Sequence, residues 1–297
     1  MAAPAVSASA WERRWPAPAK LNLFLHVVGR RDDGYHLLQT AFRLIDLCDT
    51  LEFAPRADGA VRLASLLAGV AEDDDLAVRA ARVLQGAAGV AAGATIRVEK
   101  RIPIGGGLGG GSSDAATTLI ALNELWGARL PRSELARLGL GLGADVPFFL
   151  LGRNAFAEGI GEVLAPLELA PAWYVVITPQ VAVSTREIFA SNALTRNTKP
   201  LKITAFFAGL GANDLEAETC RRYPQVAQAL EWLKAFGDAR MSGSGSSVFA
   251  AFGSEREARA VAAKIPAAWR GVAVRGLDRH PLAPEGLHDG LGSSQAG

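Results

Sequence analysis

The sequence is poor in cysteine and has no long apolar run. Cys48 and Cys220 are its only 2 cysteines, and their spacing fits neither a metal site nor a redox pair, so we expect buried thiols in a reducing compartment. No apolar stretch approaches the ~20 residues of a membrane span. Residues 1–16 also lack the long apolar core of a secretory signal. These absences predict a cytoplasmic protein without a membrane partner.

The sequence also lacks an excess of charge of either sign. Its 297 residues include 31 basic and 30 acidic side chains, which leaves a net charge of +1 at pH 7. That balance argues against nucleic acid as the main partner, so any affinity for phosphate must be local. With 49% hydrophobic and 21% charged residues, the composition is that of a globular protein, and the length favours two domains.

Glycine, by contrast, is abundant and is concentrated in one segment. Six of the twelve residues at 103–114 are glycine, which is entropically costly unless the backbone approaches a ligand closely or adopts positive φ. The alternating residues 94–99 predict a strand before this segment, and residues 115–126 predict a helix after it, with 112–114 as N-cap candidates. A strand, a glycine loop and a helix N-terminus together form an anion site. We therefore predict a phosphate-binding loop rather than a flexible linker.

Other known glycine loops fit this segment poorly. A Walker A loop would need a Lys-Ser or Lys-Thr pair after the last glycine, and none follows. Gly105, Gly107 and Gly110 satisfy the dinucleotide-binding spacing, but the acidic residue about 20 positions further on, Glu124, falls inside the predicted helix. The strand lysine and His-Arg-Asp loop of protein kinases are also missing. A dinucleotide-dependent oxidoreductase stays open as an alternative.

Two further segments carry polar side chains that suit catalysis. In a predicted strand at 20–28, Lys20 and Asn22 share the face opposite the leucines, and this face either enters a cleft or is solvated. Asp145 lies between glycines and an apolar run, with Pro147 after it, which fits either a helix cap or a catalytic carboxylate. The residues alone leave both choices open.

The turn after this strand presents an aromatic pair. Tyr35 and His36 follow a hairpin-type Asp-Gly dipeptide, and they either stack on a planar base or pack against the protein. His26 is interpreted as structural. Periodicity and turn residues predict two strands within 37–53, on either side of a turn at Asp46–Asp49. They also predict helices at 75–84, 131–142 and 255–265, strands at 154–159, 173–178, 247–252 and 272–275, a helix cap at 213–215 and a second glycine turn at 241–249.

The run Pro-Ile-Gly-Gly-Gly-Leu-Gly-Gly-Gly-Ser-Ser-Asp-Ala-Ala at 103–116 resembles the phosphate loop of the GHMP kinase superfamily, which includes galactokinase, homoserine kinase and mevalonate kinase. Lys-Leu-Asn at 20–22, Gly-Tyr-His at 34–36 and Gly-Ala-Asp-Val-Pro-Phe at 143–148 are similar to further motifs of that family. The resemblance implies an α+β fold of two domains. The first resembles the second domain of ribosomal protein S5 and the second is ferredoxin-like, with the active site between them.

The domain boundaries follow from this resemblance and from a proline-bounded segment at 166–171. We expect an N-terminal kinase domain at 17–165 and a C-terminal domain at 166–282. A disordered N-terminal extension at 1–16 and a disordered tail at 283–297 would flank them.

The resemblance implies that ATP, accompanied by Mg²⁺, phosphorylates a small alcohol. Asp145 would accept the hydroxyl proton, and Lys20 would stabilise negative charge beside it. Ser113 is a metal-ligand candidate by analogy only. The residues expected to bind ATP are Pro103, Ile104, Gly105, Gly106, Gly107, Leu108, Gly109, Gly110, Gly111, Ser112 and Ser113. The residues expected to bind the second substrate are Asn22, Tyr35, His36, Thr185 and Phe189.

The motifs are most similar to the branch of the family that phosphorylates the 2-hydroxyl of 4-diphosphocytidyl-2-C-methylerythritol in the non-mevalonate isoprenoid pathway. In that branch the Gly-Tyr-His segment lines the cytidine pocket. A kinase of the mevalonate or homoserine type stays open, and so does a binding-only module, which the balanced charge and the presence of both Lys20 and Asp145 disfavour. We expect a monomer or weak homodimer.

Overall fold

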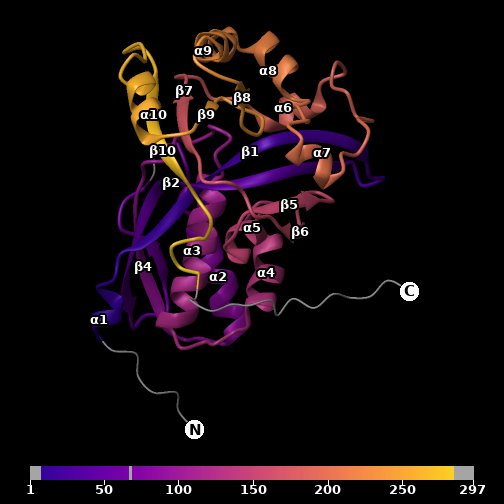
Figure 1. Cartoon of the computed structure of the whole chain (residues 1–297). Coiled ribbons are helices and arrows are strands. Elements are labelled where there is room, and N and C mark those ends of the chain that lie inside the picture. The colour runs from indigo at the N-terminus through magenta and orange to yellow at the C-terminus, as the bar shows by residue number, and fades with distance from the viewer. Residues whose placement is uncertain (1–7, 67–68, 284–297) are drawn as a thin grey trace.

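The fold is built on one continuous sheet. The structure is a computed structural model that describes residues 8–66 and 69–283. Within these residues a 10-stranded sheet has the order β3-β4-β2-β10-β7-β9-β8, with β1 and β5 also paired to β2, and β6 paired to β5 (Figure 1). The strands are β1 (Trp15–Arg30), β2 (His36–Arg56), β3 (Val61–Leu63), β4 (Gly93–Glu99), β5 (Ala155–Glu158), β6 (Val163–Pro166), β7 (Trp173–Thr178), β8 (Ala239–Met241), β9 (Val248–Phe252) and β10 (Arg270–Leu277).

The helices gather in two groups. Figure 1 shows α2 to α5 together on one side of the long β1 and β2 strands, and α6, α8 and α9 at the opposite end of the molecule. The helices are α1 (Ala8–Trp11), α2 (Leu76–Ala88), α3 (Gly110–Leu125), α4 (Arg132–Leu140), α5 (Val146–Leu151), α6 (Thr185–Ala190), α7 (Ile203–Phe207), α8 (Glu216–Arg222), α9 (Pro224–Lys234) and α10 (Glu255–Ala262), with a 3-10 turn at Glu72–Asp74. No helix in the described part of the chain has the length and hydrophobicity needed to cross a bilayer.

The strand β1 is buried along most of its length, on both faces. Lys20 and Asn22 are almost as inaccessible as Leu21 between them, so the face that could have been solvated is enclosed. β1 pairs with β2 in an antiparallel register that sets Lys20 opposite Leu44 and Asn22 opposite Phe42. The pairing slips between Asn22 and Leu25, where a bulge interrupts the alternation of faces.

The prediction of two strands within 37–53 is wrong, because β2 runs from His36 to Arg56 without a break. The acidic residues around Asp49 read as a turn in the sequence. Asp49 instead lies inside the strand, fully buried, and its carboxylate accepts the N–H groups of Arg101 at 2.5 Å and Ile102 at 2.8 Å. Buried hydrogen bonds from a distant segment therefore override a local turn signal.

The last strand joins the two halves of the chain. β10 pairs with β7 along most of its length, and its final residues, Gly276 and Leu277, pair with Ile45 and Leu44 of β2. The division of the chain at residue 166 stays a prediction.

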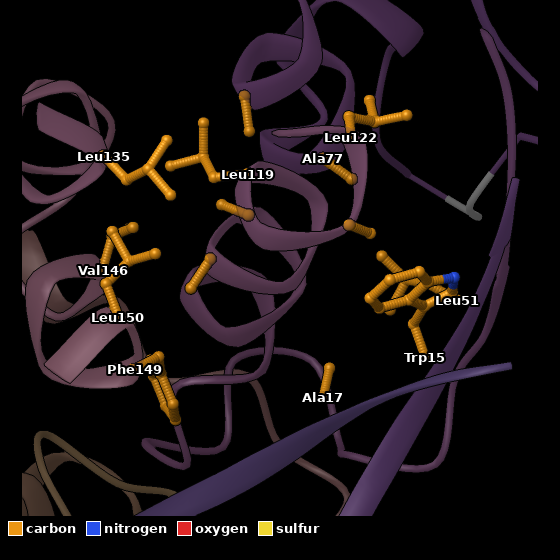
Figure 2. Packing of buried hydrophobic residues seen from close by; sticks show 14 of the residues in the cluster. Trp15, Ala17, Leu51, Ala77, Leu119, Leu122, Leu135, Val146, Phe149 and Leu150 are labelled. Atoms are coloured by element: carbon orange, nitrogen blue, oxygen red, sulfur yellow. The ribbon is translucent and has the colours of Figure 1, made fainter. Parts of the chain in front are cut away.

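One hydrophobic core lies between the first half of the sheet and α2 to α5. Figure 2 shows Leu119 of α3 pointing toward Leu135 of α4, with Trp15 and Leu51 coming from β1 and β2. A second core, around β7, β9 and α9, contains Val175, Ile177, Leu230, Leu233 and Val248. The site described below lies where loops of both halves meet.

The expected disorder of residues 1–16 is wrong for the part that the structure describes. α1 occupies Ala8–Trp11, and β1 begins at Trp15, whose ring is buried and meets Phe53 edge-on at 6.4 Å. Burial of a large aromatic ring fixes this segment to the core. Residues 1–7 and 284–297 lie outside the described residues. The two thiols are half-buried rather than buried, and burial raises the pKa of Cys48 to about 12 and that of Cys220 to about 11.

Candidate active site

A cavity of about 690 Å³ collects most of the predicted site residues. It opens between the β1–β2 hairpin, the phosphate loop, the start of α5 and the helix α6. Its lining includes Lys20, Asn22, Tyr35, His36, Gly107, Gly109, Ser112, Asp145, Thr185 and Phe189. Residues from four distant segments of sequence therefore meet in one space.

The ammonium group of Lys20 makes three polar contacts at the base of this cavity. The residue is 4% exposed, and Nζ donates to Asn22 Oδ1 at 2.5 Å and to the carbonyl of Gly107 at 3.1 Å. Its third contact is an ion pair with Oδ2 of Asp145 at 3.5 Å. A buried ammonium requires such partners, and these three connect β1, the phosphate loop and the segment before α5.

Asp145 is not a helix cap. It precedes α5, and Pro147 lies within the first turn as predicted, but the Asp145 side chain makes no capping hydrogen bond. Its carboxylate instead faces Lys20 and lines the cavity with 31% of the side chain exposed. The geometry therefore leaves a carboxylate that a ligand can reach, held beside a cation.

The phosphate loop enters α3 earlier than predicted. The helix begins at Gly110 instead of residue 115, after Gly109 in the left-handed conformation at φ 73°. Residues 112–114 thus lie inside the helix, and no described side chain caps its first turn. The N–H groups of that turn are free to bind an anion at the positive end of the helix dipole.

The predicted second glycine turn, residues 241–249, packs against this loop. Ser242 Oγ donates to the carbonyl of Gly107 at 3.0 Å, and the N–H of Ser247 donates to the carbonyl of Gly106 at 3.1 Å. Gly107 has a φ of 72°, and a Cβ there would lie 2.2 Å from the carbonyl oxygen of Ser242. Only glycine fits this crossing of two backbones.

Several residues expected to bind ATP lie outside the cavity lining. Ile104 is 62% exposed, and Leu108 is buried in a small core with Ile102. The Ser113 hydroxyl is buried and donates to the carbonyl of Pro18 at 2.7 Å, so it is engaged within the protein. The other expected ATP residues outside the lining are Pro103, Gly105, Gly106, Gly110 and Gly111.

The opposite end of the cavity is aromatic. The His36 ring lies 4.9 Å from the Phe189 ring, with 31° between their planes, and Tyr35 beside them is 61% exposed. Burial lowers the pKa of His36, and the positive charges of Arg196 and Arg30 lower it further. The pair therefore presents a neutral, largely apolar surface suited to a planar base.

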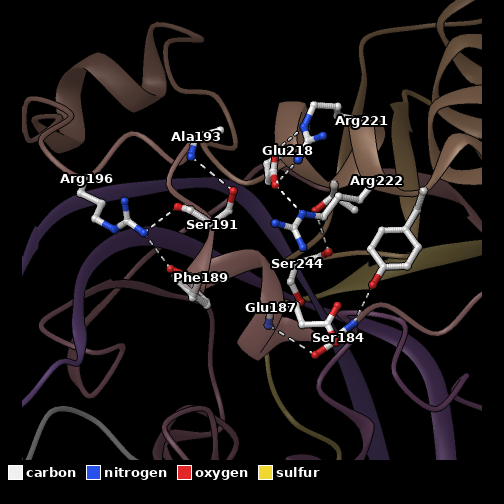
Figure 3. A network of polar contacts seen from close by, with 12 residues as sticks. Ser184, Glu187, Phe189, Ser191, Ala193, Arg196, Glu218, Arg221, Arg222 and Ser244 are labelled. Carbon is white, nitrogen blue, oxygen red and sulfur yellow. Dashed lines mark hydrogen bonds and ion pairs between the residues drawn. The ribbon is translucent and has the colours of Figure 1, made fainter.

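The helix α6, which carries Thr185 and Phe189, is fixed by a polar network (Figure 3). The Ser184 hydroxyl caps α6 by accepting the N–H of Glu187. The Thr185 and Ser244 hydroxyls hydrogen-bond at 2.6 Å, which links α6 to the second glycine turn. In α8, the nearly buried carboxylate of Glu218 binds Arg221 and Arg222, and hydrogen bonds from these guanidinium groups lower its pKa.

A buried ionic triad connects the two ends of the phosphate loop. Lys100, just before the loop, donates to Asp49 of β2 and, at 2.6 Å, to Asp114 of α3. Burial raises the pKa of Asp114 to about 7, since the charge of Lys100 offsets the loss of solvent only in part. The other carboxylate oxygen of Asp114 is buried without a hydrogen-bond partner in the described chain.

Comparison with known proteins agrees with this arrangement. The family model described as GHMP kinases N terminal domain matches residues 75–153, and that described as GHMP kinases C terminal matches residues 195–271. The chain is 60% identical over 267 residues to 4-diphosphocytidyl-2-C-methyl-D-erythritol kinase of an Azoarcus species, which covers 90% of this chain and 95% of the relative. The protein of that name from Thiobacillus denitrificans is 59% identical over 268 residues, covering 90% of this chain and 96% of the relative.

This chain belongs to the GHMP kinase family. A crystal structure of 4-(cytidine 5'-diphospho)-2C-methyl-D-erythritol kinase superposes with a TM-score of 0.77 at 38% identity, covering 89% of this chain and 99% of the other. A mevalonate kinase structure has a TM-score of 0.65 at 15% identity, covering 90% and 100%, and this likeness shows the fold alone. The predicted α+β GHMP kinase fold is confirmed.

Sequence reasoning missed other residues of this GHMP kinase that line the same cavity. Thr40 and Phe42 come from β2, and Gly243 and Ser244 come from the second glycine turn. The side chain of Thr40 accepts the amide of Asn22 at 3.0 Å, and the Lys20 ammonium lies 5.4 Å from the Phe42 ring centre. The pairing of β2 with Lys20 and Asn22 is the signal that could have placed Thr40 and Phe42 in the cavity. This pairing is known only once the β1–β2 hairpin has formed.

A metal site made by protein groups alone is not evident in this GHMP kinase. No group of three or more His, Cys, Asp or Glu side chains within residues 8–66 and 69–283 is arranged to hold a metal ion. The Ser113 hydroxyl, engaged with Pro18, does not fit the role suggested by analogy. Asp145 is the carboxylate that lines the cavity nearest the loop, and Mg²⁺ commonly combines one or two such carboxylates with substrate phosphates.

Proposed function

We propose that this protein transfers the γ-phosphoryl group of ATP to the 2-hydroxyl of 4-diphosphocytidyl-2-C-methyl-D-erythritol, within isoprenoid precursor synthesis. The relatives with about 60% identity carry the name of this kinase, and they match almost the whole of their own length. The mevalonate and homoserine kinase structures are 15% and 17% identical, so they support only the fold.

The observation that carries the proposal is the contact of Lys20 with both Asp145 and Gly107. Lys20 Nζ lies 3.5 Å from the Asp145 carboxylate and 3.1 Å from the Gly107 carbonyl. A candidate proton acceptor is therefore held at the end of the candidate phosphate loop. Phosphoryl transfer depends mainly on such positioning and on stabilisation of charge.

Each group has a defined part in the transfer. Asp145 takes the proton of the acceptor hydroxyl while the hydroxyl oxygen of the acceptor forms a bond to the γ-phosphorus. The bond from that phosphorus to the β–γ bridging oxygen breaks, and ADP is released. Lys20 orients the carboxylate and stabilises negative charge on the transferring group. The free N–H groups of Gly110, Gly111 and Ser112 hold ATP phosphates at the start of α3.

The acceptor lies along the other end of the cavity. Tyr35 and Phe189 stack on the cytosine and His36 lies at its edge, while Asn22 and Thr185 lie nearer the reacting end, beside Lys20 and Ser244 respectively. Asp145 is the protein carboxylate that would help to hold the Mg²⁺ accompanying ATP, and the ion would supply positive charge to the phosphates.

The test is ADP release with a panel of acceptors at equal concentration. The panel contains diphosphocytidyl-methylerythritol, mevalonate, homoserine and galactose, and the Asp145→Asn protein serves as the matched inactive control. We expect turnover of the cytidine compound alone, with ³¹P NMR placing the new phosphate on the 2-hydroxyl. Comparable turnover of mevalonate or homoserine would reassign the acceptor within the family.

A further inference from the structure

Arg196 lies outside every motif of the sequence, yet it contacts the aromatic end of the active site directly. Its Nε–H donates to Nε2 of His36 at 3.1 Å. His36 begins β2, whereas Arg196 lies in the segment after α6, so the bond joins two distant parts of the chain. Among residues 8–66 and 69–283, the other ring nitrogen of His36, Nδ1, has no hydrogen-bond partner.

The guanidinium group is itself held firmly. Nη2 donates to the carbonyl oxygens of Phe189 at 3.0 Å and Ser191 at 2.7 Å (Figure 3). Nη1 donates to the carbonyl oxygen of Leu194 at 3.2 Å. These bonds hold the end of α6 and the residues after it against the guanidinium group. Its Nε–H is therefore aimed at His36 by a fixed planar fork.

This contact determines the chemical state of the His36 ring. An arginine donates hydrogen bonds and accepts none, so Nε2 must offer its lone pair and carry no proton. The neutral ring then keeps its single proton on Nδ1. Protonation of Nε2 would break the bond and set two cations against each other.

The surrounding charges act in the same direction. Burial comes first among the causes that lower the pKa of His36, followed by Arg196 and then by Arg30 of β1. Arg186 of α6 adds a further cation to the cavity lining. The carboxylate in that lining nearest in sequence, Asp33, is paired with Arg31 at 2.7 Å.

We propose that Arg196 is a specificity-determining positioning residue: it fixes His36 as the neutral Nδ1–H tautomer, so that the cavity offers a hydrogen-bond donor to the base of the acceptor. The inference rests on the proposed function, in which that base is cytosine. Cytosine presents acceptors at N3 and O2, whereas uracil presents an N–H at N3. A ring whose N–H is fixed on Nδ1 can donate to the acceptors of cytosine. Against uracil the same N–H would face the N–H at N3, so two donors would oppose each other.

The tautomer is tested by ¹⁵N NMR of the full-length protein labelled at histidine. The chain has 4 histidines, and the His36→Gln spectrum assigns the signal of interest. We expect His36 to be protonated on Nδ1 and to titrate below the usual range. In Arg196→Met both tautomers should appear and the pKa should rise. In the control Arg30→Met, which removes a nearby charge but not the bond, the tautomer should stay as in the wild type.

Kinetics test the consequence for substrate. Arg196→Met should raise the KM for the cytidine acceptor about tenfold, as for loss of one oriented hydrogen bond, with little change in kcat or in the KM for ATP. The preference for the cytidine acceptor over its uridine analogue should fall by a similar factor. In the His36→Gln background, Arg196→Met should add little, because the two residues act through one contact.

Two outcomes overturn the inference. One is a wild-type ring protonated on Nε2, which needs no variant to detect. The other is an Arg196→Met protein with the wild-type tautomer, pKa and base preference. If wild-type protein fails to phosphorylate the cytidine acceptor at all, the proposed function is contradicted, and the NMR result still decides what Arg196 does to His36.

Discussion

Nζ of Lys20 lies 3.5 Å from Oδ2 of Asp145, although one residue belongs to the first strand and the other follows α4. The carboxylate is part of no helix cap and the ammonium is nearly inaccessible. One partner of this ion pair is therefore enclosed, and the other is open to the cavity.

Asp145→Asn keeps the size of the side chain and removes the proton acceptor. We expect kcat to fall by about 10²–10⁴, which is typical for loss of a general base. ATP binding, measured by calorimetry, should change little because the phosphate loop is intact. A variant with near-normal kcat would contradict the assignment of the base.

Lys20→Met removes the charge that faces both Asp145 and Gly107. Turnover should fall severely, since the transferring group loses its nearest cation. The double variant with Asp145→Asn should be little slower than the slower single variant, as for residues that act as a unit. Multiplicative losses in steady-state kinetics would show that the two act independently.

Gly107→Ala should weaken ATP binding and stability together. The added Cβ would lie 2.2 Å from the Ser242 carbonyl oxygen, in addition to the strain of a φ of 72°. Gly105→Ala is the matched control, because its φ is 70° but nothing lies within 4 Å of the added atom. We expect the Gly107 variant to show a higher KM for ATP and a Tm several degrees below that of the control. If both variants had the same Tm and the same KM for ATP, the close contact between Gly107 and Ser242 would have no part in nucleotide binding.

Phe189→Ala removes one side of the aromatic pair and should act on the acceptor alone. Stacking on a base is worth roughly 1–3 kcal/mol in nucleic-acid systems, so the acceptor KM should rise about tenfold or more. The KM for ATP should stay near the wild-type value, and His36→Ala should show the same asymmetry. Parallel losses for both substrates would indicate that α6 had lost its fold.

Asp114 should make stability depend on pH in a particular direction. Its folded pKa of about 7 lies above the ordinary value of 3.8, so the folded state holds a proton that the unfolded state has lost. The favourable contribution is complete below the ordinary value and disappears as pH rises from about 4 to about 7. Urea unfolding should therefore show a falling free energy of unfolding over that range.

Asp114→Asn provides the check on this prediction. The variant should lose much of the pH dependence and be more stable than the wild type at pH 8, on the order of 1–2 kcal/mol, since one buried charge is removed. Asp49→Asn is the contrasting control. Asp49 accepts two backbone N–H groups, so its change should destabilise the protein at every pH. An Asp114→Asn protein with the wild-type pH profile would assign the dependence to other groups.

Much of the fold could be predicted from local patterns. The alternation at 94–99 and the apolar periodicity at 75–84 became β4 and α2, and Asp75 caps α2 by accepting the N–H groups of Ala77 and Val78. The predictions failed where distant groups replaced local ones. Asp49 looked like a turn residue until backbone donors from another segment buried it.

The cap expected at 213–215 is met in position but not in chemistry: α8 follows Leu215, whose N–H donates to Asn213 Oδ1 at 3.0 Å, but this N-cap residue makes no side-chain cap. The Asn213 amide donates to the carbonyl oxygens of Met241 and Gly243, and Asp214 accepts the N–H of Val27. These side chains join α8 to the second glycine turn and to β1 instead of capping a helix. Their hydrogen-bonding capacity is visible in the sequence, but their partners are not.

Residue type and spacing within single segments were enough to predict the glycine loop, the lysine, the aspartate and the aromatic pair. That these segments meet in one cavity, that Ser113 is engaged with Pro18 and that Arg196 reaches His36 became visible in the folded chain. Side-chain chemistry is local, whereas a hydrogen bond between residues far apart in sequence exists only after strands have paired and both cores have packed.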